Sequence, residues 1–161
     1  MDNIYKASPK HPSHLSIGAI VINQQNQVLC NHYSKFGHLE DIYTLMTQTH
    51  QPGLTIEQSV AAGLKEEFGI EPDLSAMSYL GTKTYKDKWF AESPTMVEKT
   101  VVYLLVRVGD DVQPVVGADN TEEVTAKWIE INELVKKMQE QGIEHGVSYL
   151  DESAMLKLAV N

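Results

Sequence analysis

The chain has 161 residues, of which 42% are hydrophobic and 22% are charged, an ordinary composition for one globular domain. Its formal net charge of -9 argues against a nucleic acid polymer as partner, because binding to a phosphate backbone relies on Lys and Arg. No apolar run reaches the roughly 18 residues of a membrane span, and the first residues lack the apolar centre of a signal peptide. We therefore expect a cytoplasmic protein that makes no membrane contact.

The first part of the chain is predicted to be an arm followed by strands. Residues 1–14 contain two prolines and several polar residues, which predicts a flexible N-terminal arm, and residues 15–161 are expected to form a single domain. Two β-rich runs at 15–22 and 28–33 flank an Asn/Gln-rich turn, so they predict a hairpin or consecutive strands. A further short strand is expected at 43–46. Cys30, the single cysteine, sits in an apolar run and is predicted to be a core residue.

The clearest local signal is a helix with a defined start and end. Thr55 followed three residues later by Gln58 is a capping box, which predicts that the helix begins at Ile56. Gly69 is typical of the residue that closes a last helical turn in the left-handed conformation. At about 100° per residue, the apolar side chains share one sector that should face a core. These residues are Ile56, Val60, Ala61, Leu64 and Phe68.

Two carboxylates lie along the edge of that apolar sector. Glu66 and Glu67 share a strip of the helix with Ser59 and Gly63, whose side chains are very small. Two adjacent like charges repel unless a cation lies between them. A divalent ion such as Mg²⁺, which takes oxygen ligands and keeps waters for a phosphate-bearing substrate, would supply that cation.

The segment resembles a Nudix box, G-x5-E-x7-R-E-U-x-E-E-x-G-U, where U is a bulky aliphatic residue. The second half of the motif matches at Leu64, Glu66, Glu67, Gly69 and Ile70. The first half departs from it, with Gln48 for the first Gly, Leu54 for the early Glu and Ala62-Gly63 for the Arg-Glu pair. The family takes its metal ligands from the Glu of that pair and from the two later glutamates. The resemblance thus implies Mg²⁺ or Mn²⁺ at Glu66 and Glu67, and a third carboxylate is missing at Gly63.

The missing carboxylate has no obvious substitute within the helix. Glu57 lies nine residues before Glu66, which places it half a turn away around the helix. A glycine inside a helix costs roughly 1 kcal/mol relative to alanine. Gly63 therefore reflects either drift or a need for space at that point.

Residues 77–90 are expected to form one or two strands around Gly81. Lys83 and Lys86 lie in this stretch and would bind substrate phosphate if the strand borders the cleft; the alternative is a solvated strand edge protected by lysines. The run 98–108 has a nearly continuous apolar centre, which predicts a strand buried on both faces.

The last third of the chain contains one more candidate ligand. Glu122 precedes Trp128 by six residues, and the resemblance aligns it with a position where many family members carry an additional metal-binding or base carboxylate. Glu123 is the neighbouring alternative, and a solvated turn is the simpler interpretation of the pair. An amphipathic helix is expected from Asn132 and a final helix over 149–160.

The resemblance covers about residues 15–140 and implies an α/β fold, an α/β/α sandwich around a mixed, curved sheet. It leaves two functions open. The first is a metal-dependent hydrolase of a nucleoside diphosphate linked to another group, with Glu66, Glu67 and Glu122 as metal-binding and catalytic residues. The second is a Nudix-fold binding or regulatory module without hydrolysis. In both cases the expected partner is a small phosphorylated, nucleotide-like ligand, and the resemblance also suggests a homodimer.

Overall fold

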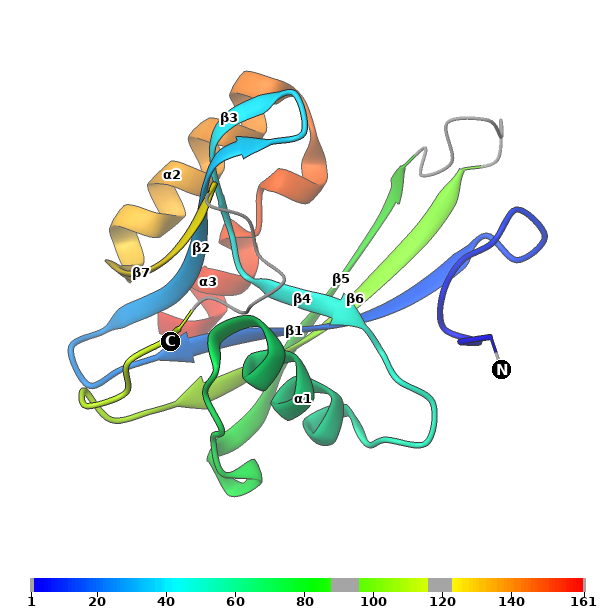
Figure 1. Ribbon diagram of the computed structural model, residues 1–161. Helices are drawn as coiled ribbons and strands as arrows, with labels where there is room; N and C mark the ends of the chain where they lie inside the picture. Colours follow the sequence, from blue (N-terminus) through cyan, green and yellow to red (C-terminus); the bar gives the residue numbers. More distant parts are fainter. Residues whose placement is uncertain (1, 88–95, 116–122, 161) are drawn as a thin grey trace.

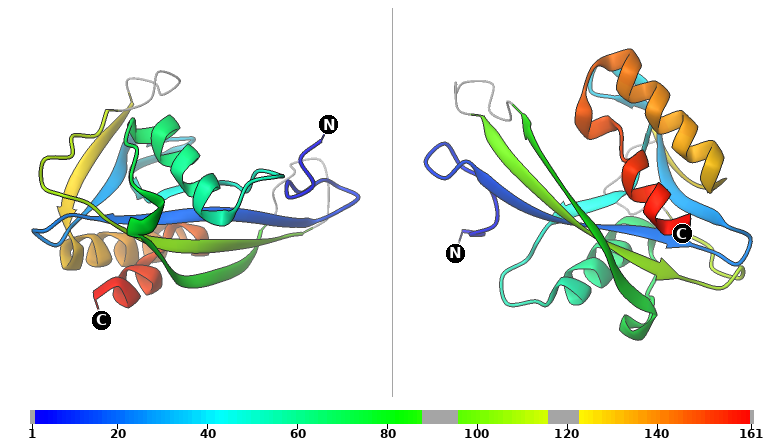
Figure 2. Two further views of the ribbon diagram at one scale, coloured as in Figure 1. Left: turned by 90° about the horizontal axis from the view of Figure 1, so that it is seen from below. Right: turned by 180° about the vertical axis from the view of Figure 1, so that it is seen from behind.

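The computed structural model describes residues 2–87, 96–115 and 123–160. In that part of the chain, seven strands form one mixed sheet, with α1 on one face and α2 and α3 on the other, as Figures 1 and 2 show. The strands are β1 (Ser13–Ile22), β2 (Gln27–Phe36), β3 (Leu39–Thr44), β4 (Met46–Thr49), β5 (Met77–Asp87), β6 (Val97–Arg107) and β7 (Val124–Glu130). The helices are α1 (Ile56–Phe68), α2 (Ile131–His145) and α3 (Ser153–Val160), with short 3-10 turns at Leu74–Ala76 and Ser148–Leu150. The expected α/β sandwich is confirmed.

The sheet divides into two wings. Its order is β3-β2-β1-β6-β5, with β4 added to β1 and β7 added to β2. Strands β1 and β2 pair where their hairpin turns, at Ile22 and Val28. Beyond that point β1 pairs with β4 and β6, whereas β2 pairs with β3 and β7. We call β2, β3 and β7 the first wing, and β1, β4, β5 and β6 the second.

Each face of the sheet has its own apolar core. The core under α1 contains Ile17, Ala19, Val21, Leu29, Met46, Val60, Leu64, Phe68, Ile70, Leu104 and Val106. The core under α2 and α3 includes Ile20, Val28, Cys30, Leu45, Val101, Tyr103, Leu134, Met138 and Leu156. Cys30 is fully buried there, which confirms its predicted core position.

Local sequence signals determine the limits of α1. The Thr55 side chain accepts a hydrogen bond from the Gln58 backbone N–H, and the Gln58 side chain accepts one from the Thr55 N–H, which completes the predicted capping box. Gly69 closes the helix with φ of +66°. The helix therefore begins at Ile56 and ends at Phe68, as expected.

The strands follow the predictions with local differences. β6 lies between β1 and β5 and has buried residues on both faces, as expected for the run 98–108. Residues 77–87 form one strand, with an irregularity between Tyr79 and Gly81, whereas 88–90 lie outside the described residues. The stretch expected as a strand at 43–46 is divided between β3 and β4, with Leu45 between them.

The N-terminal residues contact the start of β1. The Ala7 N–H donates to His14 Nδ1 at 3.1 Å, and the Leu15 N–H donates to the Tyr5 carbonyl at 2.9 Å. The Tyr5 ring also lies 4.6 Å from the His50 ring between centroids. β1 itself begins at Ser13, within the stretch assigned to the arm. No helix of the described chain is long and apolar enough to cross a bilayer.

The C-terminal segment is attached to the first wing by Gln141 of α2. Its side-chain amide donates to the carbonyls of Tyr43 and Leu150, at 2.7 Å each, and its carbonyl accepts from the Tyr43 N–H at 2.9 Å. Because Gln141 is 5% exposed, these bonds lie away from water. They hold the chain that leads into α3 against β3.

Replacing Gln141 with Ala should lower the free energy of unfolding by about 2–3 kcal/mol, because it leaves buried backbone groups without partners. Urea denaturation measures the change, with Gln139→Ala in the same helix as the control, expected within about 0.5 kcal/mol of the parent. Equal effects from the two variants would show that the amide bonds of Gln141 contribute nothing specific.

Candidate functional site

The two predicted carboxylates at the end of α1 occupy different environments. The Glu66 side chain is exposed to solvent, whereas Glu67 is largely covered. The side-chain amide of Asn31, a fully buried residue of β2, donates to Glu67 Oε1. The side chain of Gln48 on β4 makes a second hydrogen bond to the same carboxylate. Glu67 therefore links α1 to both wings of the sheet.

Burial dominates the electrostatics of Glu67. Removal from water raises the pKa of its carboxyl group to about 7, and the charges of Glu152 and Glu66 act in the same direction. The hydrogen bonds from Asn31 and Gln48 oppose the shift, because they favour the ionised form. A perturbed carboxylate of this kind is typical of functional sites, although buried structural networks produce it as well.

Gly63 lies where α1 closely approaches two side chains of β4. A Cβ atom at this position would lie 2.9 Å from Met46 Sδ and 3.2 Å from Gln48 Oε1. Real Cβ atoms essentially never come within 3.0 Å of another heavy atom, so a glutamate here would have to displace Met46. A side chain at position 63 would therefore need space that the ends of the Met46 and Gln48 side chains occupy.

Beside Glu66 and Glu67, the described residues supply no third carboxylate that could complete a divalent-cation site with them. No group of three His, Cys, Asp or Glu side chains in the described ranges could hold a metal ion. Mg²⁺ is usually held by one or two carboxylates together with several waters, whereas the Glu67 carboxylate is hydrogen-bonded by two amides. Glu122, the predicted third ligand, lies outside the described residues. Glu123 is described, and its backbone carbonyl accepts from the Ser34 N–H at 2.8 Å.

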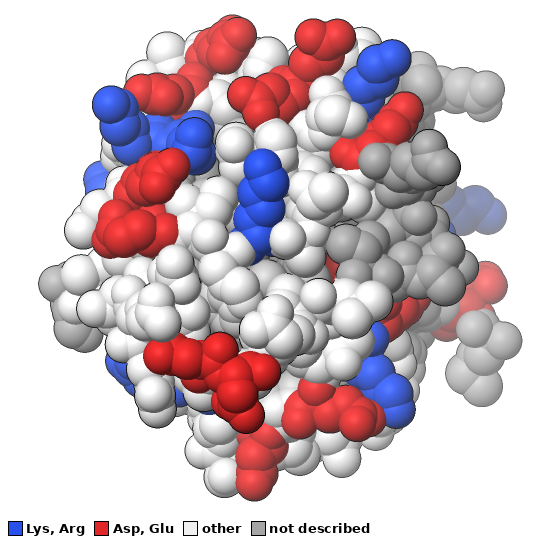
Figure 3. All heavy atoms as spheres, turned by 60° about the vertical axis from the view of Figure 1, so that its left-hand side comes forward, with Lys and Arg blue, Asp and Glu red and all other residues white. Residues whose placement is uncertain are grey.

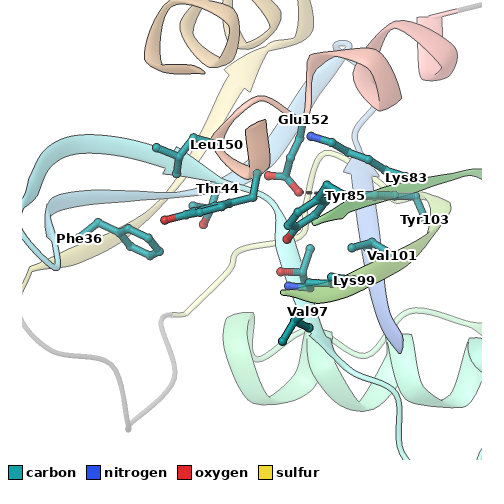
Figure 4. Close-up of a pocket in the computed structure, with 12 residues that line it drawn as sticks. Phe36, Thr44, Lys83, Tyr85, Val97, Lys99, Val101, Tyr103, Leu150 and Glu152 are labelled. Atoms are coloured by element: carbon teal, nitrogen blue, oxygen red, sulfur yellow. Dashed lines mark hydrogen bonds between the residues drawn. The ribbon is translucent and has the colours of Figure 1, made fainter. Parts of the chain in front are cut away.

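A cavity of about 380 Å³ lies on the other side of β4 from α1, beside the C-terminal segment. Figure 4 shows that Tyr85 and Lys99 face it from β5 and β6, with Phe36 on the opposite side. Its lining residues are Phe36, Thr44, Thr47, Lys83, Tyr85, Val97, Lys99, Val101, Tyr103, Tyr149, Leu150 and Glu152. We call it the Lys83 cavity.

Two ammonium groups and an aromatic ring form one wall of the Lys83 cavity. Lys83 Nζ and Lys99 Nζ lie 5.6 and 5.8 Å from the centre of the Tyr85 ring. That ring also stacks on Tyr149, with centroids 6.2 Å apart. Burial lowers the pKa of both lysines, and the nearby charge of Glu152 opposes the change.

Glu152 brings a carboxylate into the same cavity. It accepts a hydrogen bond from the Tyr103 hydroxyl at 2.6 Å and another from the Leu45 N–H at 3.0 Å. Burial raises the pKa of Glu152, while these two hydrogen bonds and the charges of Lys83 and Lys99 act against the rise. The close-up in Figure 4 shows Glu152 entering from the C-terminal segment toward Tyr103.

The Lys83 cavity and the end of α1 adjoin each other across Thr44. Thr44 lines the cavity and shares a hydrogen bond with the Tyr33 hydroxyl. The pKa of Tyr33 is raised by burial and then by the charge of Glu67. The charge of Glu152 also raises the pKa of the Glu67 carboxyl group. A ligand in the cavity would therefore lie near the end of α1.

The structure separates the two lysines predicted to bind phosphate. Lys83 lines the cavity, whereas Lys86 is exposed and does not belong to the lining. Side chains alternate along a strand, so Lys83 and Tyr85 share one face of β5 and Lys86 takes the other. Alternation along the 98–108 run would also have put Lys99 beside Tyr103.

Three comparisons relate this site to known proteins. The model of the NUDIX domain family matches residues 12–149. A search of curated proteins found no match. Solved structures match the fold: the dihydroneopterin triphosphate pyrophosphohydrolase of E. coli is 17% identical with a TM-score of 0.65, covering 91% of this chain and 95% of that one.

Two further structures are similar. The Ap4A hydrolase of C. elegans is 16% identical with a TM-score of 0.63, covering 91% of this chain and 94% of its own. The NUDIX domain of Shewanella oneidensis NrtR, solved in complex with ADP ribose, is 17% identical with a TM-score of 0.55, covering 81% and 86%. At these identities the likeness establishes the fold. Glu152 lies beyond the residues matched by the family model.

Replacing Glu67 with Gln should stabilise the protein increasingly as pH rises. The folded-state pKa of Glu67 is raised from 4.5 to about 7, so ionisation destabilises the fold and wild-type stability is lost as pH passes through that value. The gain should reach at most about 3 kcal/mol near pH 8 and be small near pH 5. Denaturant unfolding at several pH values measures it, with exposed Glu66→Gln as the control. A gain in stability that does not change with pH would contradict the raised pKa of Glu67.

Proposed function

The chain belongs to the Nudix family, and from this premise we propose that it binds a small phosphorylated, nucleotide-like ligand in the Lys83 cavity, as a binding module without metal-dependent hydrolysis. The observation that carries the proposal is the pair of ammonium groups held by neighbouring strands around the Tyr85 ring. Ammonium groups bind phosphate, and an aromatic wall stacks on a ring. A volume of about 380 Å³ falls within the usual range for small-molecule sites.

A small ligand suits this protein better than a nucleic acid polymer. The chain carries a net charge of -9, so a long phosphate backbone would be repelled. Figure 3 shows one face on which acidic side chains form several groups and the basic side chains do not join into a continuous surface. The lysines of the Lys83 cavity are instead gathered at one concave site.

The absence of hydrolysis is inferred from the arrangement around Glu67. Asn31 and Gln48 provide the hydrogen bonds that stabilise a buried carboxylate, and Met46 with Gln48 occupies the space of the third ligand. The amide hydrogen bonds take the place of a cation beside Glu67, and the two β4 side chains take the place of the third carboxylate. The NrtR domain solved with ADP ribose shows that this fold accommodates a nucleotide-like ligand.

The second candidate function is the metal-dependent hydrolase. It would use Mg²⁺ or Mn²⁺ with Glu66, Glu67 and Glu122 to cleave a nucleoside diphosphate linked to another group. One observation favours it: Glu67 is desolvated, and its raised pKa is what a nearby cation would reverse. Two of the similar structures are also named as a hydrolase and a pyrophosphohydrolase.

Replacing Lys99 with Met should weaken the binding of AMP at least about tenfold, because the loss of one buried charge-assisted contact costs roughly 1.4 kcal/mol or more. Isothermal titration calorimetry in EDTA measures the affinity, with Lys136→Met on the exposed face of α2 as the control. Lys86→Met in the same series tests the second predicted lysine. If AMP bound Lys99→Met as tightly as wild type, the ligand site would lie elsewhere.

Incubation with nucleoside diphosphate derivatives and millimolar Mg²⁺ or Mn²⁺ separates the two functions. The binding module should release no product above the level seen with Glu67→Gln. Metal-dependent product release by the wild-type protein that is lost in Glu67→Gln would establish the hydrolase instead.

A further inference from the structure

The charged groups of the Lys83 cavity nearly balance one another. Among the described residues that line it, Lys83 and Lys99 are cationic and Glu152 is anionic. If all three are ionised, the lining carries a single positive charge. Glu152 is 6% exposed and fixed by Tyr103 and Leu45, so it cannot turn away from the lysines without breaking both hydrogen bonds.

Further acidic groups surround this balanced set. Asp151 precedes Glu152, and its backbone carbonyl accepts from Lys83 Nζ at 2.5 Å. The charge of Asp151 acts on Lys83. Glu67 lies beyond Thr44 and is close enough to Glu152 for their charges to interact. A ligand with many negative charges would therefore meet repulsion from three carboxylates at a site with two ammonium groups.

We infer that Glu152 limits the charge of the ligand, so that the cavity selects an aromatic compound carrying one phosphate over the corresponding di- and triphosphates. The inference rests on the proposed function, because it assigns a specificity to the same cavity. A single phosphate monoester, which carries about -1.5 to -2 charges at pH 7, already offsets the one positive charge of the lining. A second or third phosphate brings negative charge toward Glu152, Asp151 and Glu67 without a described cation to compensate it.

Glu152 is also a feature of this chain beyond the family match. The match to the family model ends at residue 149, and Glu152 enters the cavity from the segment that follows. Its position depends on contacts with distant parts of the chain, at Leu45 and Tyr103. Removal of its charge should therefore change the charge preference without changing the aromatic wall.

Calorimetric titration of AMP, ADP and ATP in EDTA tests the inference. Wild type should bind AMP at least about threefold more tightly than ADP or ATP, whereas Glu152→Gln should bind ATP at least about tenfold more tightly than wild type does. The glutamine keeps one oxygen, which can accept from the Leu45 N–H, and its NH₂ group can donate to the Tyr103 hydroxyl oxygen. Glu144→Gln, which removes an exposed negative charge from α2, is the matched control and should leave all three affinities unchanged.

A double variant keeps the inference testable if Glu152→Gln disturbs the fold. Lys99→Met removes one positive charge, and adding Glu152→Gln restores the original net charge of the lining, so the pair should recover AMP affinity at least about threefold over Lys99→Met alone. Wild-type affinity that is equal for the three nucleotides or rises with each phosphate, or a lack of response to Glu152→Gln, would overturn the inference. Failure of AMP to bind wild type, or no loss in Lys99→Met, would instead remove the proposed function itself.

Discussion

A carboxylate removed from water needs either a cation or hydrogen-bond donors, and Glu67 finds donors in Asn31 and Gln48. The arrangement of the rest of the site depends on these two hydrogen bonds. Gln48 reaches Glu67 because β4 passes close to α1, and Gly63 leaves room there for the ends of the Met46 and Gln48 side chains. Gln48, which binds the carboxylate, thus also lies with Met46 in the space that a side chain at position 63 would need.

The division of the sheet into two wings determines where the Glu152 carboxylate lies. β4 pairs with β1, and β3 pairs with β2. Leu45 connects β3 to β4, and its backbone N–H donates to Glu152 in the C-terminal segment. Glu152 binds there and meets Lys83 and Lys99 from the second wing. Two buried carboxylates therefore lie on opposite sides of β4, one stabilised by amides and the other by a hydroxyl, a backbone N–H and two lysines. The lysines gather positive charge in an otherwise acidic protein.

The sequence was sufficient for local features and for part of the site. Thr55, Gln58 and Gly69 determine the limits of α1 through neighbouring residues, so the helix was predicted to the residue. Glu67 and Lys83 were candidate site residues in the sequence, but the residues that they contact are distant: Asn31 is 36 positions from Glu67, and Asp151 is 68 positions from Lys83. No local pattern marks Glu152. Gln48 was noted as a departure from the motif, and only the packing shows what it contacts. A homodimer, a cytoplasmic location and a role for Glu122 stay predictions.

The most direct measurement is the side-chain amide signal of Asn31 in a ¹⁵N-labelled sample, followed during separate titrations with Mg²⁺ and with AMP. The account predicts that millimolar Mg²⁺ leaves the Asn31 signal in place, because the amide already binds Glu67 and no cation enters between them. AMP should shift the backbone signals of β5, β6 and the residues around Glu152. A Mg²⁺-dependent shift of Asn31, with no response to AMP along β5 and β6, would contradict the account.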